Sequence, residues 1–226
     1  MITKRMNMPK EIRIERKTHK FVTTPRGSRS GVKIPLLTLL RDILKYCDTA
    51  AEAKKVIRVR KILIDQKVYT DWKFGLGIMD TIFIPSLNKA WRILPKPYPT
   101  AVEIPQNEAG LKIGKVIRKQ CVRGGSIQIT LHDGRNILLP KDTQIKPYDS
   151  VLIKLPSQEI VEHLPFATGF LALISKGKNT GQIAMIKNIE RGLKKRLILT
   201  SNKKDFEAPY DGVIVVGKEK PVISLY

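Results

Sequence analysis

The chain has few of the residues that build covalent or catalytic sites. Only two of its 226 residues are cysteines and three are histidines. Cys47 and Cys121 lie far apart in the sequence and neither belongs to a C-x-x-C pair. This spacing argues against both a disulfide framework and a zinc site. We expect both cysteines to be small buried hydrophobic residues.

Acidic residues and long apolar runs are also scarce. The chain has 20 Asp and Glu against 42 Lys and Arg, which gives a formal net charge of +22. No run of about 18 apolar residues is present and the N-terminus does not resemble a signal peptide, so we expect no membrane span and a cytoplasmic location. So basic a chain is expected to bind a polyanion, such as nucleic acid or an anionic membrane surface. Its 42% of hydrophobic residues is enough for one to three small domains.

Residues 1–35 are the most basic segment per residue, with ten Lys and Arg against two acidic residues. The segment has little apolar periodicity, and Gly27, Ser28, Ser30 and Gly31 keep it pliable. We predict a basic arm that orders along phosphates; the alternative is a solvated terminus. The arm residues predicted to bind RNA are Lys10, Arg13, Arg16, Lys17, Lys20, Arg26, Arg29 and Lys33.

Residues 36–95 have the pattern of two helices packed on a small sheet. Leucines and isoleucines recur three and four positions apart after Pro35, which predicts a first helix. Thr49 and Glu52 have the spacing of a capping box, which predicts a second helix through about Val59. The strands predicted after this helix span residues 62–64, 68–70 and 79–84.

The rest of the chain has the pattern of short strands. The prolines of residues 96–110 indicate a linker. Turn residues at regular intervals then favour two small barrels or sandwiches. The predicted strands span residues 115–120, 126–131, 136–139, 150–155, 169–174, 183–189, 195–200 and 212–216. The predicted fold class is therefore α+β and mostly β.

Motifs of catalysis are missing. His19, His132 and His163 are dispersed, and His132 beside Asp133 is typical of a hairpin turn rather than of a general base. The segment Gly177–Gly181 lacks the end of a Walker motif, and no pair of acids lies in an apolar setting. We predict a binding protein with no catalytic residue, no cofactor, no metal site and no small-molecule substrate.

Several stretches resemble parts of one family. The stretch EAKKVIRVRKILIDQKVYTD with FGLGIMDTIFI resembles the helical RNA-binding domain first named for bacterial small-subunit ribosomal protein four. The preceding PLLTLLRDILKYC is similar to the archaeal and eukaryotic e-type version. The stretch GFLALISKGKNTGQIAMIKNIERG is similar to a KOW motif, and GVIVVGKEKPVISL to the C-terminal end of the same family. The order of these parts indicates a member of the e-type small-subunit ribosomal protein four family.

The resemblance implies a domain order and a set of departures. It implies a basic N-terminal arm (1–35), a helical RNA-binding domain (36–95), a central β-barrel-like domain (96–165) and a C-terminal KOW barrel of SH3-like type (166–226). Gln66 stands where the family usually has a turn glycine, and Lys176 and Ala184 replace glycines near the KOW loop. These departures concern detailed contacts rather than the family.

Two groups of basic residues are candidates for RNA binding outside the arm. Helical spacing places the first group on or near the polar side of the second helix: Lys54, Lys55, Arg58, Arg60, Lys61 and Lys67. Such a face suits the phosphates and 2′-hydroxyls of A-form RNA, and the resemblance assigns it to rRNA; a solvated helix face is the alternative. The second group shares one hairpin loop, where glycine allows a close backbone approach: Lys176, Gly177, Lys178, Asn179 and Gly181.

Other candidates have a plain structural alternative. The runs Lys194–Arg196 and Lys203–Lys204 fit RNA contacts and the protection of exposed strand edges equally well. Trp72 and Trp91 follow or precede apolar strand residues, so core packing is favoured over stacking on bases.

The function implied is that of a structural constituent of the small ribosomal subunit. Its expected partners are small-subunit rRNA and neighbouring ribosomal proteins, and it is expected to support subunit assembly and translation. One alternative is an RNA-modifying enzyme that docks through the helical domain, which would need a buried acid such as Asp133 or Asp142 with a raised pKa. Another is a ribosome-associated or polymerase-associated RNA-binding factor.

Overall fold

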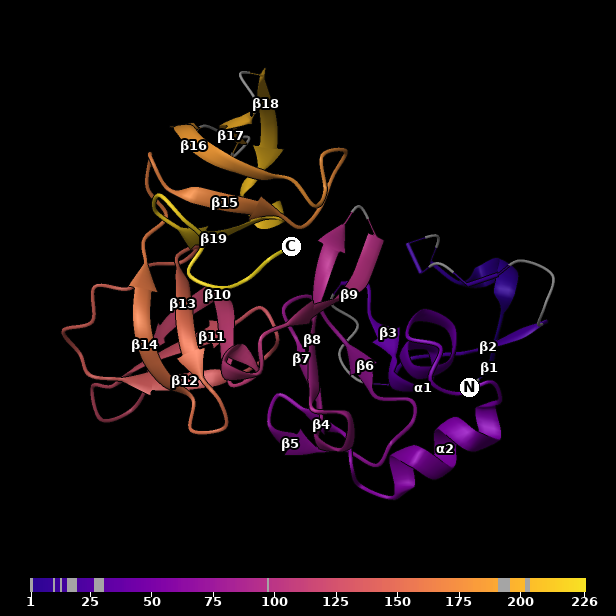
Figure 1. The fold of residues 1–226 in the computed structure, drawn as a ribbon. Coiled ribbons are helices and arrows are strands. Elements are labelled where there is room, and N and C mark those ends of the chain that lie inside the picture. The colour runs from indigo at the N-terminus through magenta and orange to yellow at the C-terminus, as the bar shows by residue number, and fades with distance from the viewer. Residues whose placement is uncertain are drawn as a thin grey trace. The chain divides into compact units, whose positions relative to one another are not determined.

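The computed structural model describes residues 2–9, 11–12, 14–15, 20–26, 31–96, 98–190, 196–201 and 204–226. They form two compact units (Figure 1). Unit 1 comprises residues 1–110 with Tyr226, and unit 2 comprises residues 111–225. Strands predominate in both units, which confirms a mostly β chain with few helices. The finer division into an arm and three domains remains a prediction.

Unit 1 is built on an antiparallel five-stranded sheet in the order β5-β4-β7-β8-β9. Its strands are β4 (Leu63–Ile64), β5 (Lys67–Val68), β7 (Thr81–Ile84), β8 (Lys89–Lys96) and β9 (Tyr98–Ile104). A second small sheet pairs β3 (Ile34–Pro35) with β6 (Gly75–Leu76). Short 3₁₀ turns, η3 (Pro85–Leu87) and η4 (Gln106–Glu108), lie at the ends of β7 and β9.

The two predicted helices are present in unit 1. Helix α1 (Leu36–Thr38) continues as a π-helical segment, η2 (Leu39–Ile43). Helix α2 (Ala50–Arg58) begins at the predicted capping box, in which the Thr49 hydroxyl accepts from the Glu52 amide and the Glu52 carboxylate accepts from the Thr49 amide. The box satisfies amides that the helix itself leaves unpaired. The start of α2 is therefore fixed by local sequence.

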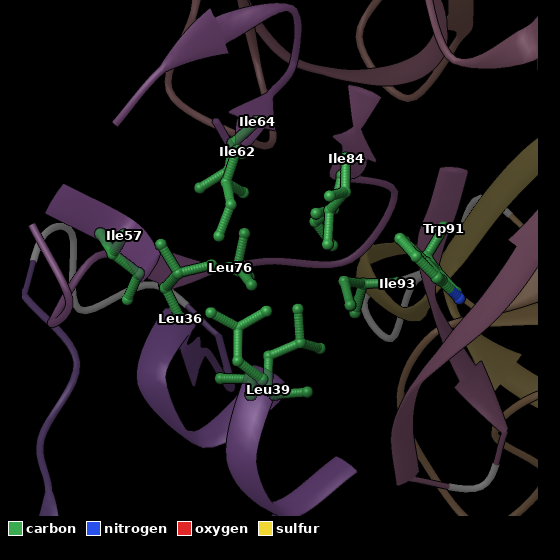
Figure 2. Close-up of a cluster of buried hydrophobic side chains, with 12 residues drawn as sticks. Leu36, Leu39, Ile57, Ile62, Ile64, Leu76, Ile84, Trp91 and Ile93 are labelled. Carbon is green, nitrogen blue, oxygen red and sulfur yellow. The ribbon is translucent and has the colours of Figure 1, made fainter. Parts of the chain in front are cut away.

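Side chains from both helices and the sheet meet in one core (Figure 2). Leu36 and Leu39 come from the first helical segment, Ile57 from α2, and Ile62, Ile64 and Ile93 from around the sheet. Full burial of each such side chain stabilises the fold by about 1.5–3 kcal/mol. Because Ala53 and Ile57 face inward, the basic residues of α2 face solvent.

Residues 96–110 do not form the predicted linker. Strand β9 runs antiparallel to β8, with Ala90 opposite Ile104 and Lys96 opposite Tyr98. Pro99 is compatible with a strand here because β9 lies at the edge of the sheet, where the backbone amides on one side need no partner strand. The hairpin belongs to the sheet of unit 1.

The described part of residues 1–35 has more structure than a bare arm. Strand β1 (Ile2–Lys4) pairs with β2 (Phe21–Thr23), and a single 3₁₀ turn, η1 (Arg5–Asn7), follows β1. Met8, Ile12 and Val22 are buried in a small apolar cluster. These residues are spaced irregularly, which is why the sequence shows no apolar period there.

Unit 2 contains two antiparallel five-stranded sheets. The first has the order β12-β11-β10-β13-β14 and encloses an apolar core. Its strands are β10 (Leu111–Cys121), β11 (Ile127–Leu131), β12 (Asn136–Leu139), β13 (Ser150–Lys154) and β14 (Glu159–Leu164). Cys121 ends β10 exposed, so the prediction that it is buried is wrong, whereas Cys47 in unit 1 is buried as predicted.

The second sheet of unit 2 has the order β18-β17-β16-β15-β19. Its strands are β15 (Leu171–Ile174), β16 (Ile183–Glu190), β17 (Arg196–Ser201), β18 (Lys204–Pro209) and β19 (Val213–Gly217), with the turn η5 (Tyr210–Gly212) before β19. The two sheets are joined by buried polar contacts: the Ser150 hydroxyl accepts from the Val215 amide at 3.0 Å, and the Lys115 ammonium donates to the Tyr210 carbonyl at 2.5 Å. The sheets thus form one unit.

Candidate nucleic-acid interface

The basic residues predicted around α2 lie together on unit 1. Lys55, Arg58, Arg60, Lys61 and Lys67 are all exposed. Arg60 follows the end of the helix with a positive φ of 61°, and its amide donates to the Ile57 carbonyl at 3.1 Å. The carboxylate of Glu52 lies at the opposite end of α2, where hydrogen bonding by Thr49 and the amides of the cap lowers its pKa. The C-terminal half of α2 and the loop after it are therefore cationic.

Lys54, the remaining predicted residue of this group, is held against an aromatic ring. Its ammonium lies 4.4 Å from the centroid of the Trp72 ring, and the ammonium of Lys73 lies 4.8 Å from the same centroid. The ring also packs against Leu37, Cys47 and Ala53. Two cations on one indole extend the basic surface beyond the helix. Lys73 was missed because nothing in its sequence context indicates this contact.

The tryptophans pack as predicted rather than presenting free rings. Trp91 is 4% exposed and lies in the core of unit 1, with an edge contact to Tyr46. Trp72 is half-buried between the apolar cluster and the two lysines. Base stacking on Trp91 is excluded by its burial.

The predicted glycine loop connects β15 to β16. Lys176, Gly177 and Lys178 are exposed and Asn179 is half-buried. Gly177 and Gly181 have positive φ values of 106° and 91°, which side chains disfavour. The Gly181 amide closes the loop on the Ile174 carbonyl at 2.8 Å, and the Thr180 hydroxyl donates to the Gly177 carbonyl at 2.6 Å. The loop is a closed hairpin end that presents two lysines.

Buried contacts hold this loop to the body of unit 2. The amide and hydroxyl of Ser175 both donate to the Gly212 carbonyl, at 2.7 and 3.1 Å. A Cβ atom on Gly212 would lie 3.1 Å from the Lys176 carbonyl, so glycine allows the close approach. Burial lowers the pKa of the adjacent Lys115 to about 8; the carboxylate of Asp211 opposes this shift and the charge of Lys176 reinforces it. Lys115 and Lys176 therefore lie close enough for their charges to repel each other.

The predicted arm residues are only partly within the described structure. Lys20 and Arg26 are exposed and Lys33 is half-buried. Arg26 forms an ion pair of 3.1 Å with Asp71, yet its side chain is 74% exposed. The others lie outside the described residues: Lys10, Arg13, Arg16, Lys17 and Arg29.

The basic runs near β17 and β18 are also partly described. Lys194, Lys195 and Lys203 lie outside the described residues, and Lys204 is exposed. Arg196 forms an ion pair of 2.5 Å with Glu207, across the strands. The charge of Arg196 is thus offset by its neighbour, and β17 lies inside the sheet rather than at its edge.

The chemistry of the buried acids does not match an acid catalyst. Burial opposes the ionisation of Asp133, but the Lys112 ammonium at 3.0 Å and the Arg135 amide outweigh it and hold the pKa of Asp133 at about 2. His132 accepts the Lys115 amide through Nδ1 at 3.1 Å, which confirms a turn role. Within the described residues no group of three His, Cys, Asp or Glu could hold a metal ion. None of the described helices is long and apolar enough to cross a bilayer.

Comparisons with known proteins agree on one family. The model described as "Ribosomal family S4e" matches residues 87–160. The chain is 43% identical over 194 residues to small ribosomal subunit protein eS4 of Korarchaeum cryptofilum, and the aligned region covers 85% of this chain and 82% of that protein. It is 39% identical over 229 residues to the protein of the same name from Archaeoglobus fulgidus, covering 98% and 97%. The crystal structure of 30S ribosomal protein S4e from Thermoplasma acidophilum is similar with a TM-score of 0.73 and 26% identity, covering 87% of this chain and 100% of that chain.

Proposed function

This chain belongs to the S4e family of ribosomal proteins, and from this we propose that it is a structural constituent of the small ribosomal subunit that binds rRNA. The observation that carries the proposal is the 43% identity to a small ribosomal subunit protein over 85% of the chain. The family consists of structural ribosomal proteins, so the protein is not an enzyme. Its location is the ribosome, in the cytoplasm.

The proposed domain order assigns RNA contacts to both units. Residues 36–95, together with β9 of the same sheet, act as the helical RNA-binding domain. The remainder of residues 96–165 acts as the central β domain and 166–226 as the KOW barrel, with the arm of residues 1–35 in front. The exposed cations of α2 and the lysines of the glycine loop support this assignment. The first group lies on α2 and the segment after it, and the second lies on a hairpin end that is closed by backbone hydrogen bonds.

The proposed mechanism is electrostatic clamping with recognition of shape. Lys and Arg side chains neutralise phosphates and release condensed counterions. The deep major groove of A-form RNA resists the reading of bases by side chains, so phosphate and 2′-hydroxyl contacts predominate. Gly177 and Gly181 let the loop backbone come close to a phosphate. Neighbouring small-subunit proteins are the further partners, and support of subunit assembly and translation is the expected result.

A fractionation of native lysate on a sucrose gradient tests this function. The protein is followed before and after a wash at about 0.5 M salt, where nonspecific phosphate contacts weaken strongly. We expect stoichiometric retention on the small subunit after the wash. Loss in the wash, or a minor ribosomal fraction from the start, would overturn the proposal in favour of a ribosome-associated or polymerase-associated factor.

A further inference from the structure

The outer face of strands β10, β11 and β12 is mostly polar, with Leu138 as an exposed apolar residue, and the three strands carry no carboxylates. Alternate residues of β11 and β12 point into the core of the first sheet of unit 2, among them Ile129, Leu131 and Ile137. The residues between them therefore face outward. Strand pairing arranges them in two rows across the three strands, Arg118-Thr130-Asn136 and Gln120-Gln128-Leu138.

Most polar groups on this face have no partner within the described part of the protein. The Arg118 guanidinium forms no ion pair with any residue that the structure describes, and the side-chain amides of Gln120 and Gln128 form no hydrogen bond with such a residue. The Thr130 hydroxyl and the Asn136 Oδ1 atom are 2.7 Å apart, which leaves the Asn136 NH₂ group as a donor directed outward. The face thus presents several hydrogen-bonding groups and one cation.

The hairpin that joins β10 to β11 extends the face. Arg123 is exposed at its tip, and Gly124 and Gly125 follow with positive φ values of 93° and 79°. A Cβ atom added to either glycine would meet nothing within 4 Å. The hairpin tip is therefore an open turn that carries a second arginine.

The corresponding face of the other sheet in unit 2 differs in charge. The outer residues of β16–β18 include Glu190, Asp205 and Glu207. Asp205 pairs with Lys187 at 2.6 Å and Glu207 with Arg196, so the charges of that face are largely balanced within the protein. The face of β16–β18 thus carries carboxylates that are offset by ion pairs, whereas β10–β12 carry no carboxylates.

We propose that the outer face of β10–β12 is a further RNA-binding surface, in which Arg118, Arg123 and the amides of Gln120, Gln128 and Asn136 contact phosphates and 2′-hydroxyls of double-stranded rRNA. The inference rests on the proposed function and adds a surface to it. An amide both donates and accepts, which matches the 2′-hydroxyl, and the two arginines match phosphates. The wide and shallow minor groove of A-form RNA can lie against a sheet face that is about 10 Å wide.

A matched pair of asparagines tests the surface. Asn136 and Asn188 are both exposed strand residues on outer faces, and in both the Oδ1 atom interacts with a neighbouring group, a role that aspartate retains. We expect Asn136→Asp in the full chain to raise the dissociation constant for in vitro transcribed archaeal small-subunit rRNA about fivefold to tenfold, through a lost hydrogen bond and added repulsion. Asn188→Asp should stay within about twofold of the wild type, because its face does not meet RNA.

Two further variants keep the test independent of folding. If Asn136→Asp changes the melting temperature, Gln128→Glu probes the same face and should also weaken binding. Arg118→Gln should reduce the slope of log affinity against log salt by about one. If the wild type binds rRNA tightly and with a steep salt dependence, and Gln128→Glu and Arg118→Gln bind with the same affinity as the wild type, this inference alone is overturned. Unchanged rRNA affinity with reduced retention on assembled subunits would overturn it in favour of a protein partner, whereas absence of rRNA binding by the wild type would overturn the proposed function.

Discussion

The buried cations show that the formal charge of a residue does not place it on the surface. Lys112 and Arg92 are both 0% exposed, and each is paired with a carboxylate, Asp133 and Glu108 respectively. Lys112 and Asp133 are brought together by the sheet, so no local pattern marks them. Part of the net positive charge is therefore structural and is not available to RNA.

Lys115 predicts a specific dependence of stability on pH. Burial lowers its pKa from the ordinary 10.5 to about 8, so between these values the unfolded chain binds a proton that the folded chain does not. The free energy of unfolding should therefore rise as pH increases from 8 to 10.5, by on the order of 3 kcal/mol from this group. Lys115→Met should remove that part of the rise, as measured by urea unfolding at several pH values.

The control for this variant is a lysine that is not buried. Lys154 on β13 is exposed, and Lys154→Met should keep the pH dependence of the wild type. If Lys115→Met showed the same rise as the wild type, the ammonium of Lys115 would not be desolvated in the folded chain. Both variants remove one lysine, so subtracting the pH dependence of one unfolding free energy from that of the other cancels the effect of the general loss of positive charge at high pH.

At the scale of elements, short-range patterns were predictive because their contacts lie within a few residues. The capping box of Thr49 and Glu52 marks the start of α2 correctly. The tight turn between β4 and β5 was also predicted, and Asp65 and Gln66 have positive φ values of 49° and 62° there. Such backbone is typical of a type I′ turn, which favours glycine.

Gln66 should therefore be a suboptimal turn residue. Gln66→Gly relieves a left-handed conformation that costs roughly 1–2 kcal/mol for a residue with a Cβ, partly offset by the greater freedom of glycine in the unfolded chain. We expect a net gain of about 0.5–1 kcal/mol in the free energy of unfolding, measured by urea denaturation. Gln106→Gly places the same change in the 3₁₀ turn η4 and should destabilise. A loss of stability in Gln66→Gly would show that the amide side chain matters more than the backbone.

The elements that were missed depend on distant partners. Strand β9 contains Pro99, which is tolerated because β9 is an edge strand beside β8. Strand β18 has charged residues at three of its six positions, and only Ala208 is buried, so it lacks the apolar alternation of a typical strand. Strand β14 carries a bulge opposite β13, which interrupts the alternation of buried and exposed residues. None of these features is visible in a short window of sequence.

At the scale of the whole molecule, the candidate RNA surfaces are distributed over both units. The cations of α2 were predictable, because helical spacing and the buried positions of Ala53 and Ile57 determine the exposed side. The contact of Lys73 with Trp72 and the outer face of β10–β12 depend on tertiary packing and strand register. The sequence thus predicts a helix and a loop as candidates for RNA binding, but not the further surface proposed on β10–β12.

A double variant tests whether both units bind the same RNA. Arg58 on α2 and Lys178 in the glycine loop are exposed, and they belong to different units. We expect Arg58→Ala and Lys178→Ala each to weaken rRNA binding about twofold to fivefold and to lower the salt slope by about one. Because the sites are independent, the free-energy changes should add within about 0.5 kcal/mol in the double variant.

Filter binding at several salt concentrations measures these slopes, with Lys89→Ala as the control. Lys89 is exposed but forms an ion pair of 3.2 Å with Glu103, so its loss should leave the salt slope unchanged. If Lys178→Ala bound like the wild type while Arg58→Ala did not, the RNA contacts would lie in unit 1 alone and the loop of unit 2 would be free for a protein neighbour. If the double variant instead shows the sum of the two losses, both in binding free energy and in the slope of log affinity against log salt, one RNA must contact both units. The reason is that phosphates neutralised on two separate RNA molecules cannot contribute to the slope of one binding reaction.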